Sequence, residues 1–141
     1  MPINSPLLLD THVWIWLMNG DERLRNTKAL QLIHQASSHD QLKVSIISVW
    51  EIGLLARKKR ILLPRHPLIW VREALSQPGL TLAPLTEDVA VESSFLPGEM
   101  VGDPADRILV ATARALKATF VTADEKIQRY ATQNRIMIVA V

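Results

Sequence analysis

The chain has 141 residues, a length that suits a single domain, residues 1–141, with its own hydrophobic core. Hydrophobic residues make up 48% of the sequence and charged residues 21%, which is typical of a globular protein and excludes a disordered chain. The absence of cysteine excludes disulfides, zinc–thiolate sites and thiol nucleophiles.

The N-terminal apolar run has no basic segment before it and is interrupted early by Asp10, so we expect no secretory signal. No window approaches the roughly 18 apolar residues of a membrane span. These features, with the lack of cysteine, lead us to expect a cytoplasmic protein that does not enter a membrane.

The formal net charge of +2 comes from 16 Lys and Arg against 14 Asp and Glu. If four acids gather at one site, the rest of the chain carries about +6. An acidic pocket in a basic surface suits a polyanion that must reach a metal ion. Charge alone, however, fits an ordinary basic protein equally well.

Apolar runs and helical periodicities alternate along the chain with short connections between them. Strands are predicted over residues 7–9, 42–47, 80–85, 119–122 and 136–141. Helices are predicted over residues 11–18, 24–37, 48–60, 68–76, 86–95, 104–117 and 124–130. Pro84 favours an edge position for its strand. The alternation predicts an α/β fold in which two helical layers enclose a central, mostly parallel sheet.

Four acidic residues lie where predicted strands end or helices begin. Asp10 and Asp124 follow strands, whereas Glu51 and Asp106 fall in the first turns of helices. Each has a local explanation: Glu51, for example, completes a capping box with Ser48, and Asp10 can cap the helix after it. Taken singly, these acids indicate nothing more than helix capping.

The segment 102–111 holds the acid that is hardest to explain in this way. Asp103 is a suitable N-cap and Pro104 a suitable first helical residue. Asp106 falls one turn later, where the helix dipole favours a negative charge. Because the residues after it are nearly all apolar, the helix is expected to be mostly buried, and a buried carboxylate requires a partner.

The carboxyl ends of parallel strands share one edge of the sheet, where ligands bind in open α/β folds. Four acids on that edge would raise one another's pKa and reduce stability unless a cation neutralised them. With no cysteine and no histidine pair at ligand spacing, an all-oxygen site favours Mg²⁺ or Mn²⁺ over zinc. Such ions activate water and offset charge during phosphodiester hydrolysis.

Four blocks of the sequence resemble those of PIN-domain proteins, most closely the VapC type, which is the toxin half of bacterial toxin–antitoxin pairs. The blocks occur in the family's order over nearly the whole chain, and they are LLLDTHVW (7–14), SIISVWEI (45–52), DPADRILVA (103–111) and VTAD (121–124).

The resemblance implies a PIN fold and a Mg²⁺- or Mn²⁺-dependent endoribonuclease that leaves a 5′-phosphate and a 3′-hydroxyl. It also implies a frequent homodimer and inhibition by a small antitoxin protein. By position, the catalytic and metal-binding quartet is Asp10, Glu51, Asp106 and Asp124. We expect Asp10 and Asp106 to be the most direct ligands, Glu51 to act directly or through a water, and Asp124 to complete the charge or hold a second ion.

Further residues are expected to support this site. Asp103 serves as a capping or outer-shell acid, and Thr11 and Thr122 either hydrogen-bond the carboxylates or a water or are ordinary element-end threonines. Candidates for the RNA backbone, with a solvated basic face as the alternative, are Arg57, Lys58, Lys59, Arg65 and Arg107. The sequence departs from the family's pattern at two places. Relatives often have His shortly before Asp-Pro, where this chain has Val101–Gly102, and Arg before the last acid, where it has Ala123. Because neither position is one of the acids, we expect these departures to affect substrate contacts more than metal binding.

The scattered histidines (His12, His34, His39 and His66) are not expected to bind metal or act as general bases. Trp14, Trp50 and Trp70 fall at apolar helical positions, which favours core packing or a dimer face over base stacking. Two alternatives remain: a receiver-like Mg²⁺-binding signalling domain, and a catalytically inactive PIN-like module that binds RNA or protein.

Overall fold

The computed structural model describes residues 5–100 and 102–141, so Val101, one of the departures noted above, lies outside the described residues. Within them, five strands form one sheet in the order β3-β2-β1-β4-β5, and every neighbouring pair is parallel. The strands are β1 (Leu7–Leu9), β2 (Leu42–Ser45), β3 (Leu80–Ala83), β4 (Thr119–Thr122) and β5 (Ile138–Ala140). The expected α/β class with a parallel sheet is confirmed.

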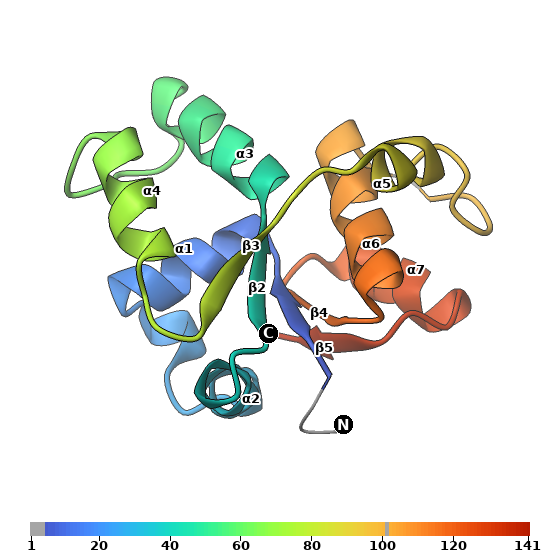
Figure 1. Ribbon diagram of the computed structural model, residues 1–141, viewed down its shortest axis with the longest axis horizontal. Coiled ribbons are helices and arrows are strands. Elements are labelled where there is room, and N and C mark those ends of the chain that lie inside the picture. The colour runs from blue at the N-terminus through green and yellow to red at the C-terminus, as the bar shows by residue number, and fades with distance from the viewer. Residues whose placement is uncertain (1–4, 101) are drawn as a thin grey trace.

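Helices cover both faces of this sheet (Figure 1). On one face lie α1 (Thr11–Asn19), the 3₁₀ turn η1 (Glu22–Leu24), α2 (Lys28–Ser38), α3 (Ile46–Arg57) and α4 (Pro67–Leu75). On the other lie α5 (Glu87–Glu92), α6 (Pro104–Leu116) and α7 (Glu125–Gln133). No helix in the described part of the chain has both the length and the apolar character needed to traverse a bilayer.

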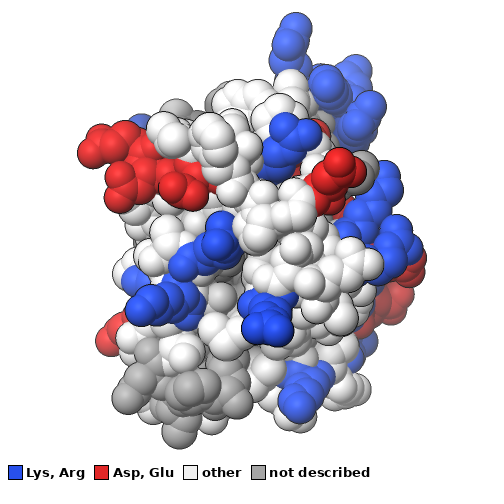
Figure 2. All heavy atoms as spheres, turned by 90° about the vertical axis from the view of Figure 1, so that its right-hand side faces the viewer, with Lys and Arg blue, Asp and Glu red and all other residues white. Residues whose placement is uncertain are grey.

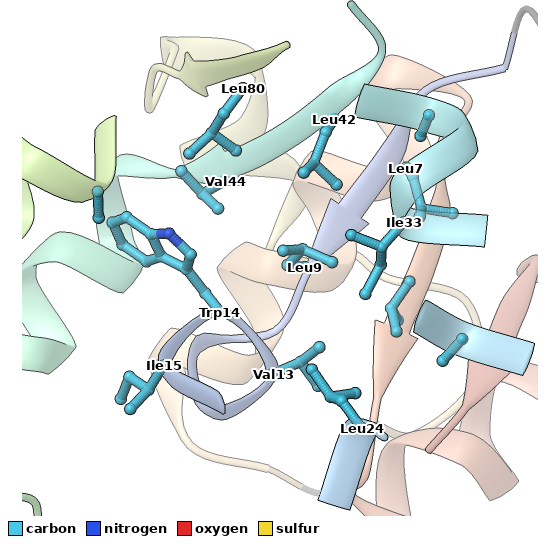
Figure 3. Packing of buried hydrophobic residues seen from close by; sticks show 14 of the residues in the cluster. Leu7, Leu9, Val13, Trp14, Ile15, Leu24, Ile33, Leu42, Val44 and Leu80 are labelled. Carbon is cyan, nitrogen blue, oxygen red and sulfur yellow. The ribbon is translucent and has the colours of Figure 1, made fainter. Parts of the chain in front are cut away.

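The central strand β1 is a continuous apolar run because the sheet is covered on both faces. Leu7, Leu8 and Leu9 are all fully buried because helices cover both faces of the sheet. Leu7 and Leu9 pack with α1, α2 and the neighbouring strands (Figure 3), whereas Leu8 packs against α6 and α7. A strand exposed to water on one face would instead alternate apolar and polar residues.

The order of the strands creates a switch point between β1 and β4. From β1 the chain builds outward through β2 to the edge strand β3, and then crosses through α5 and α6 to β4 on the opposite side of β1. The connections after β1 and β4 therefore leave in different directions, which opens a crevice at their carboxyl ends. The predicted edge position of the strand before Pro84 is also confirmed.

One sequence prediction was wrong at the start of α3. This helix begins at Ile46 rather than Ser48, and its N-cap is Ser45, whose side chain accepts the Ile47 N–H. The strand ends early because Ser45 pairs with the last residue of β3, after which Pro84 provides no N–H for another rung. The predicted capping box is therefore absent, and Glu51 lies in the second helical turn rather than the first.

Other boundaries moved by a few residues. The predicted helix 24–37 is divided into η1 and α2, because Thr27 caps a new helix start. The strand 80–85, the helix 86–95 and the strand 136–141 are shorter than predicted, and the helix predicted to reach residue 60 ends at Arg57. The helix 124–130 instead continues to Gln133. Trp14 and Trp70 pack edge to face in the core, 5.4 Å apart, but Trp50 is 57% exposed and is not a core residue.

Candidate active site

A cavity of about 360 Å³ lies at the carboxyl ends of β1 and β4. Its acidic lining consists of Asp10, Glu51, Asp103, Asp106 and Asp124. Its other lining residues are His12, Trp16, Leu55, Arg60 and Ala123. The structure therefore brings the predicted acidic quartet and Asp103 to one cavity, although they come from four separate parts of the chain.

Asp10 follows β1 and is held by two hydrogen bonds. Its Oδ1 accepts the N–H of Thr11 at 2.8 Å, and its Oδ2 accepts the Thr122 hydroxyl at 2.6 Å. Burial raises the pKa of Asp10 above its ordinary value, while these two bonds and the nearby His12 act in the opposite direction. The carboxylate is thus oriented by the neighbouring strand β4 as well as by its own helix.

Glu51 is oriented by a short chain of hydroxyl groups. The Thr11 hydroxyl donates to Glu51 Oε1 at 2.7 Å and lies 2.8 Å from the Ser48 Oγ. Since Thr11 has one hydroxyl proton and donates it to the carboxylate, Ser48 must donate to Thr11. Burial raises the pKa of Glu51, and the negative charges of Asp10 and Asp103 raise it further, whereas the hydrogen bond from Thr11 lowers it. Ser48 therefore supports Glu51 through a buried side chain rather than through a helix cap.

Asp106 experiences the combined charge of the cluster. Burial, followed by the charges of Asp103, Asp10, Asp124 and Glu51, raises the pKa of Asp106 from 3.8 to about 7. Every other acid of the cavity thus repels a negative charge at this carboxyl. A group in this position favours either a proton or a nearby cation at neutral pH.

The remaining two acids act as helix caps, as their positions in the sequence predict. Asp103 Oδ1 accepts the N–H of Asp106 at 2.9 Å, and Asp124 Oδ1 accepts the N–H groups of Lys126 and Ile127. Asp124 also donates its own N–H to the Thr122 hydroxyl at 3.0 Å. Asp124 Oδ1 accepts both capping bonds, which leaves the other carboxylate oxygen, Oδ2, outside the cap. Asp124 can therefore cap its helix and line the cavity at the same time.

The donor atoms of the cavity fit a hard divalent cation. All five acids offer oxygen, and their mutual repulsion is the kind that a cation relieves. Within residues 5–100 and 102–141, no three acidic or histidine side chains are arranged to hold an ion directly. Mg²⁺ commonly keeps several waters and contacts only one or two carboxylates, so the fit rests on the oxygen donors and on their mutual repulsion.

The structure does not bring the predicted RNA-binding residues to the cavity. Arg65 pairs with Glu73 at 3.0 Å, and the other candidates (Arg57, Lys58, Lys59 and Arg107) are exposed outside its lining. Arg60 instead lines the cavity, although sequence reasoning missed it. It belongs to the same basic run as Lys58 and Lys59, and periodicity alone does not show which member turns toward the acids.

Basic side chains are also spread over the face covered by α5, α6 and α7, whereas the acids there form separate groups (Figure 2). The two described departures from the expected family pattern lie beside the acids. Ala123 lines the cavity, and a Cβ added to Gly102 would lie 3.3 Å from Asp106 Oδ2. Small residues at these positions leave room around Asp106 and Asp124.

The fold is a parallel α/β sheet with an acid-lined cavity at its switch point. Comparison with known protein families identifies the class of protein to which this fold and site belong. The family model of the PIN domain matches residues 7–133, and the chain belongs to the PIN-domain family. This membership excludes the receiver-domain alternative.

Among known proteins, the chain is similar to Ribonuclease VapC22 of Mycobacterium tuberculosis, with 36% identity over 126 residues that span 89% of this chain and 92% of the relative. Two solved structures share its fold. One is VapBC2 from Rickettsia felis bound to a promoter DNA fragment, with a TM-score of 0.69, 15% identity and coverage of 96% of this chain and 98% of the other. The other is DNA-bound VapBC from Salmonella typhimurium, with a TM-score of 0.68, 17% identity and the same coverage.

Proposed function

We propose that this protein is a Mg²⁺- or Mn²⁺-dependent endoribonuclease and acts as the toxin of a toxin–antitoxin pair. The observation that carries the proposal is the single cavity lined by Asp10, Glu51, Asp106 and Asp124 in a PIN-domain chain. The similarity to Ribonuclease VapC22 over most of both chains supports RNA as the substrate.

In this proposal, Asp10 and Asp106 hold the ion most directly, and Glu51 contributes as a ligand or through a water. A divalent ion held there supplies an activated water and neutralises charge in the hydrolysis of a phosphodiester. Thr122 and Thr11 keep the Asp10 and Glu51 carboxylates aimed into the cavity. Asp124 adds negative charge for the same ion or a second one.

The partner in this proposal is a small cognate antitoxin. Two of the solved structures with this fold are VapBC complexes, which supports such a partner here. A homodimer, implied by the family resemblance, and a cytoplasmic location, expected from the sequence features, both stay predictions.

Purified protein tests the enzymatic part of the proposal. We expect it to cleave single-stranded RNA with Mg²⁺ or Mn²⁺, to stop with EDTA, and to leave 5′-phosphate ends. Asp10→Asn and Asp106→Asn should each abolish cleavage with the far-UV circular dichroism unchanged. Asp40→Asn is the matched control, because Asp40 is exposed and lies outside the cavity. Activity that survives chelation and dialysis, or wild-type activity in both active-site variants, would refute the proposed mechanism.

The same assay separates the proposed enzyme from the inactive-module alternative, which predicts RNA or protein binding without cleavage at any metal concentration. Expression in cells tests the toxin role. We expect growth arrest that is relieved by co-expression of the cognate antitoxin. Harmless expression of a nuclease that is active in vitro would contradict the toxin role alone.

A further inference from the structure

The cavity that holds the acids has a second region of different chemistry. This region, which we call the aromatic half, consists of His12, Trp16, Leu55 and Arg60. A cation explains the acids, but it does not explain an indole ring, an apolar side chain and a guanidinium in the same cavity.

The aromatic half is built on two elements that also carry acids. His12 and Trp16 are four residues apart on α1, the helix that Asp10 caps, so they share one face of it. Their ring centroids lie 6.4 Å apart at an interplanar angle of 55°. Leu55 lies one turn beyond Glu51 on α3, and Arg60 follows the end of that helix. The aromatic half therefore adjoins the acids along both elements.

The Trp16 ring packs against the buried core cluster and is also contacted by Arg23, which does not line the cavity. The Arg23 guanidinium lies 4.9 Å from the Trp16 ring centroid, and Arg23 is itself paired with Asp21 at 3.0 Å. Trp16 is only partly buried, unlike Trp14 and Trp70 in the core. An indole that packs against the core and still lines a cavity loses little side-chain entropy when a flat ligand stacks on it.

We propose that the aromatic half is a nucleotide subsite for single-stranded RNA, in which one base stacks on Trp16 and a neighbouring phosphate contacts Arg60. The inference rests on the proposed nuclease function and names the part of the substrate that the cavity recognises. Stacking requires an unpaired base, because a paired base has both faces covered within the duplex. Arg60 offsets the repulsion between the acids and the RNA backbone.

Binding to a short single-stranded RNA in EDTA and low salt tests the subsite without cleavage. Trp16→Ala should weaken binding at least about tenfold, as expected for the loss of one base–aromatic stack. Trp16→Phe should restore much of the affinity. Trp50→Ala is the matched control, since Trp50 is 57% exposed and lies outside the cavity. Arg60→Ala should reduce the slope of log affinity against log salt by about one unit, and more than Lys59→Ala does.

A second comparison distinguishes stacking from general damage to the fold. Oligonucleotides with one abasic position should bind wild-type protein more weakly at the stacked position, and Trp16→Ala should remove that penalty. If both proteins cleave or bind RNA but the abasic position weakens binding equally in wild type and in Trp16→Ala, the subsite inference is overturned and the proposed nuclease function is not. A wild-type protein that neither cleaves nor binds RNA would overturn the proposed function and the subsite with it.

Discussion

The Thr122 hydroxyl donates to Asp10 Oδ2 at 2.6 Å, joining the ends of β4 and β1 across 112 positions of sequence. The same hydroxyl oxygen accepts the Asp124 N–H at 3.0 Å. A single buried threonine thus orients the Asp10 carboxylate and anchors the backbone of Asp124, two of the four quartet residues. It does so at the switch point of the sheet, where the two strand ends lie side by side.

Replacing Thr122 with valine removes this hydroxyl at nearly constant volume. Because the Thr122 bond lowers the pKa of Asp10, its loss should raise that pKa further and move the activity–pH profile to higher pH. We expect a loss of about tenfold or more in kcat/KM at pH 7 and a stability cost of about 1–2 kcal/mol. Thr122→Ser should retain the profile, and an unchanged profile in Thr122→Val would contradict the role assigned to the hydroxyl.

Asp106 should make the metal-free protein less stable as pH rises. The pKa of Asp106 is about 7 in the folded state against an ordinary value of 3.8, so the folded state binds more protons between these limits. The stabilisation is complete below about pH 4 and is lost as pH rises to about 7. Asp106→Asn should therefore raise the free energy of unfolding at pH 8 by on the order of 1 kcal/mol, discounted because part of the carboxyl stays in water. Denaturant titrations in EDTA at pH 5 and pH 8 measure this, and a larger gain at pH 5 would contradict it.

A divalent cation should reverse that pH-dependent loss in the wild-type protein. A ligand that binds only the folded state stabilises it by about 3 kcal/mol at a hundredfold excess over its Kd. We expect Mg²⁺ or Mn²⁺ to raise the wild-type Tm by several degrees at pH 8, and to raise that of Asp10→Asn or Asp106→Asn much less. Differential scanning fluorimetry with EDTA reversal measures the shift, and Asp40→Asn should respond like wild type. Equal shifts in all four proteins would place the ion elsewhere.

The corrected start of α3 gives two serines different roles. Ser45→Ala should destabilise the protein by about 1 kcal/mol, because Ser45 caps the helix through the Ile47 N–H. Ser48→Ala should also cost some stability, because its hydroxyl is buried and hydrogen-bonded, but unlike Ser45→Ala it should reduce activity as well, since Ser48 supports the hydroxyl that holds Glu51. Thermal unfolding combined with cleavage assays of both variants distinguishes these roles. Unchanged activity in Ser48→Ala, or a loss of activity in Ser45→Ala as large as in Ser48→Ala, would contradict these roles.

The order of elements could be predicted from the sequence because it depends on local patterns. Leu7–Leu9 has the uninterrupted apolar character of a strand buried on both faces, and Asp103–Pro104 is a helix start that needs no distant partner. Residue types also restrict the chemistry, since a chain without cysteine offers a metal ion oxygen and imidazole ligands but no thiolate, and carboxylate oxygens suit hard cations.

Contacts between distant segments decided the rest. Ile46 and Ile47 have high strand propensity, but β2 ends at Ser45 because its partner β3 ends at Ala83. That Thr122 meets Asp10, and that Arg60 rather than Lys59 lines the cavity, depends on how strands and helices pack around the switch point. Local propensity determines which element a segment forms, whereas side chains far apart in sequence meet only where burial of the core brings their elements together.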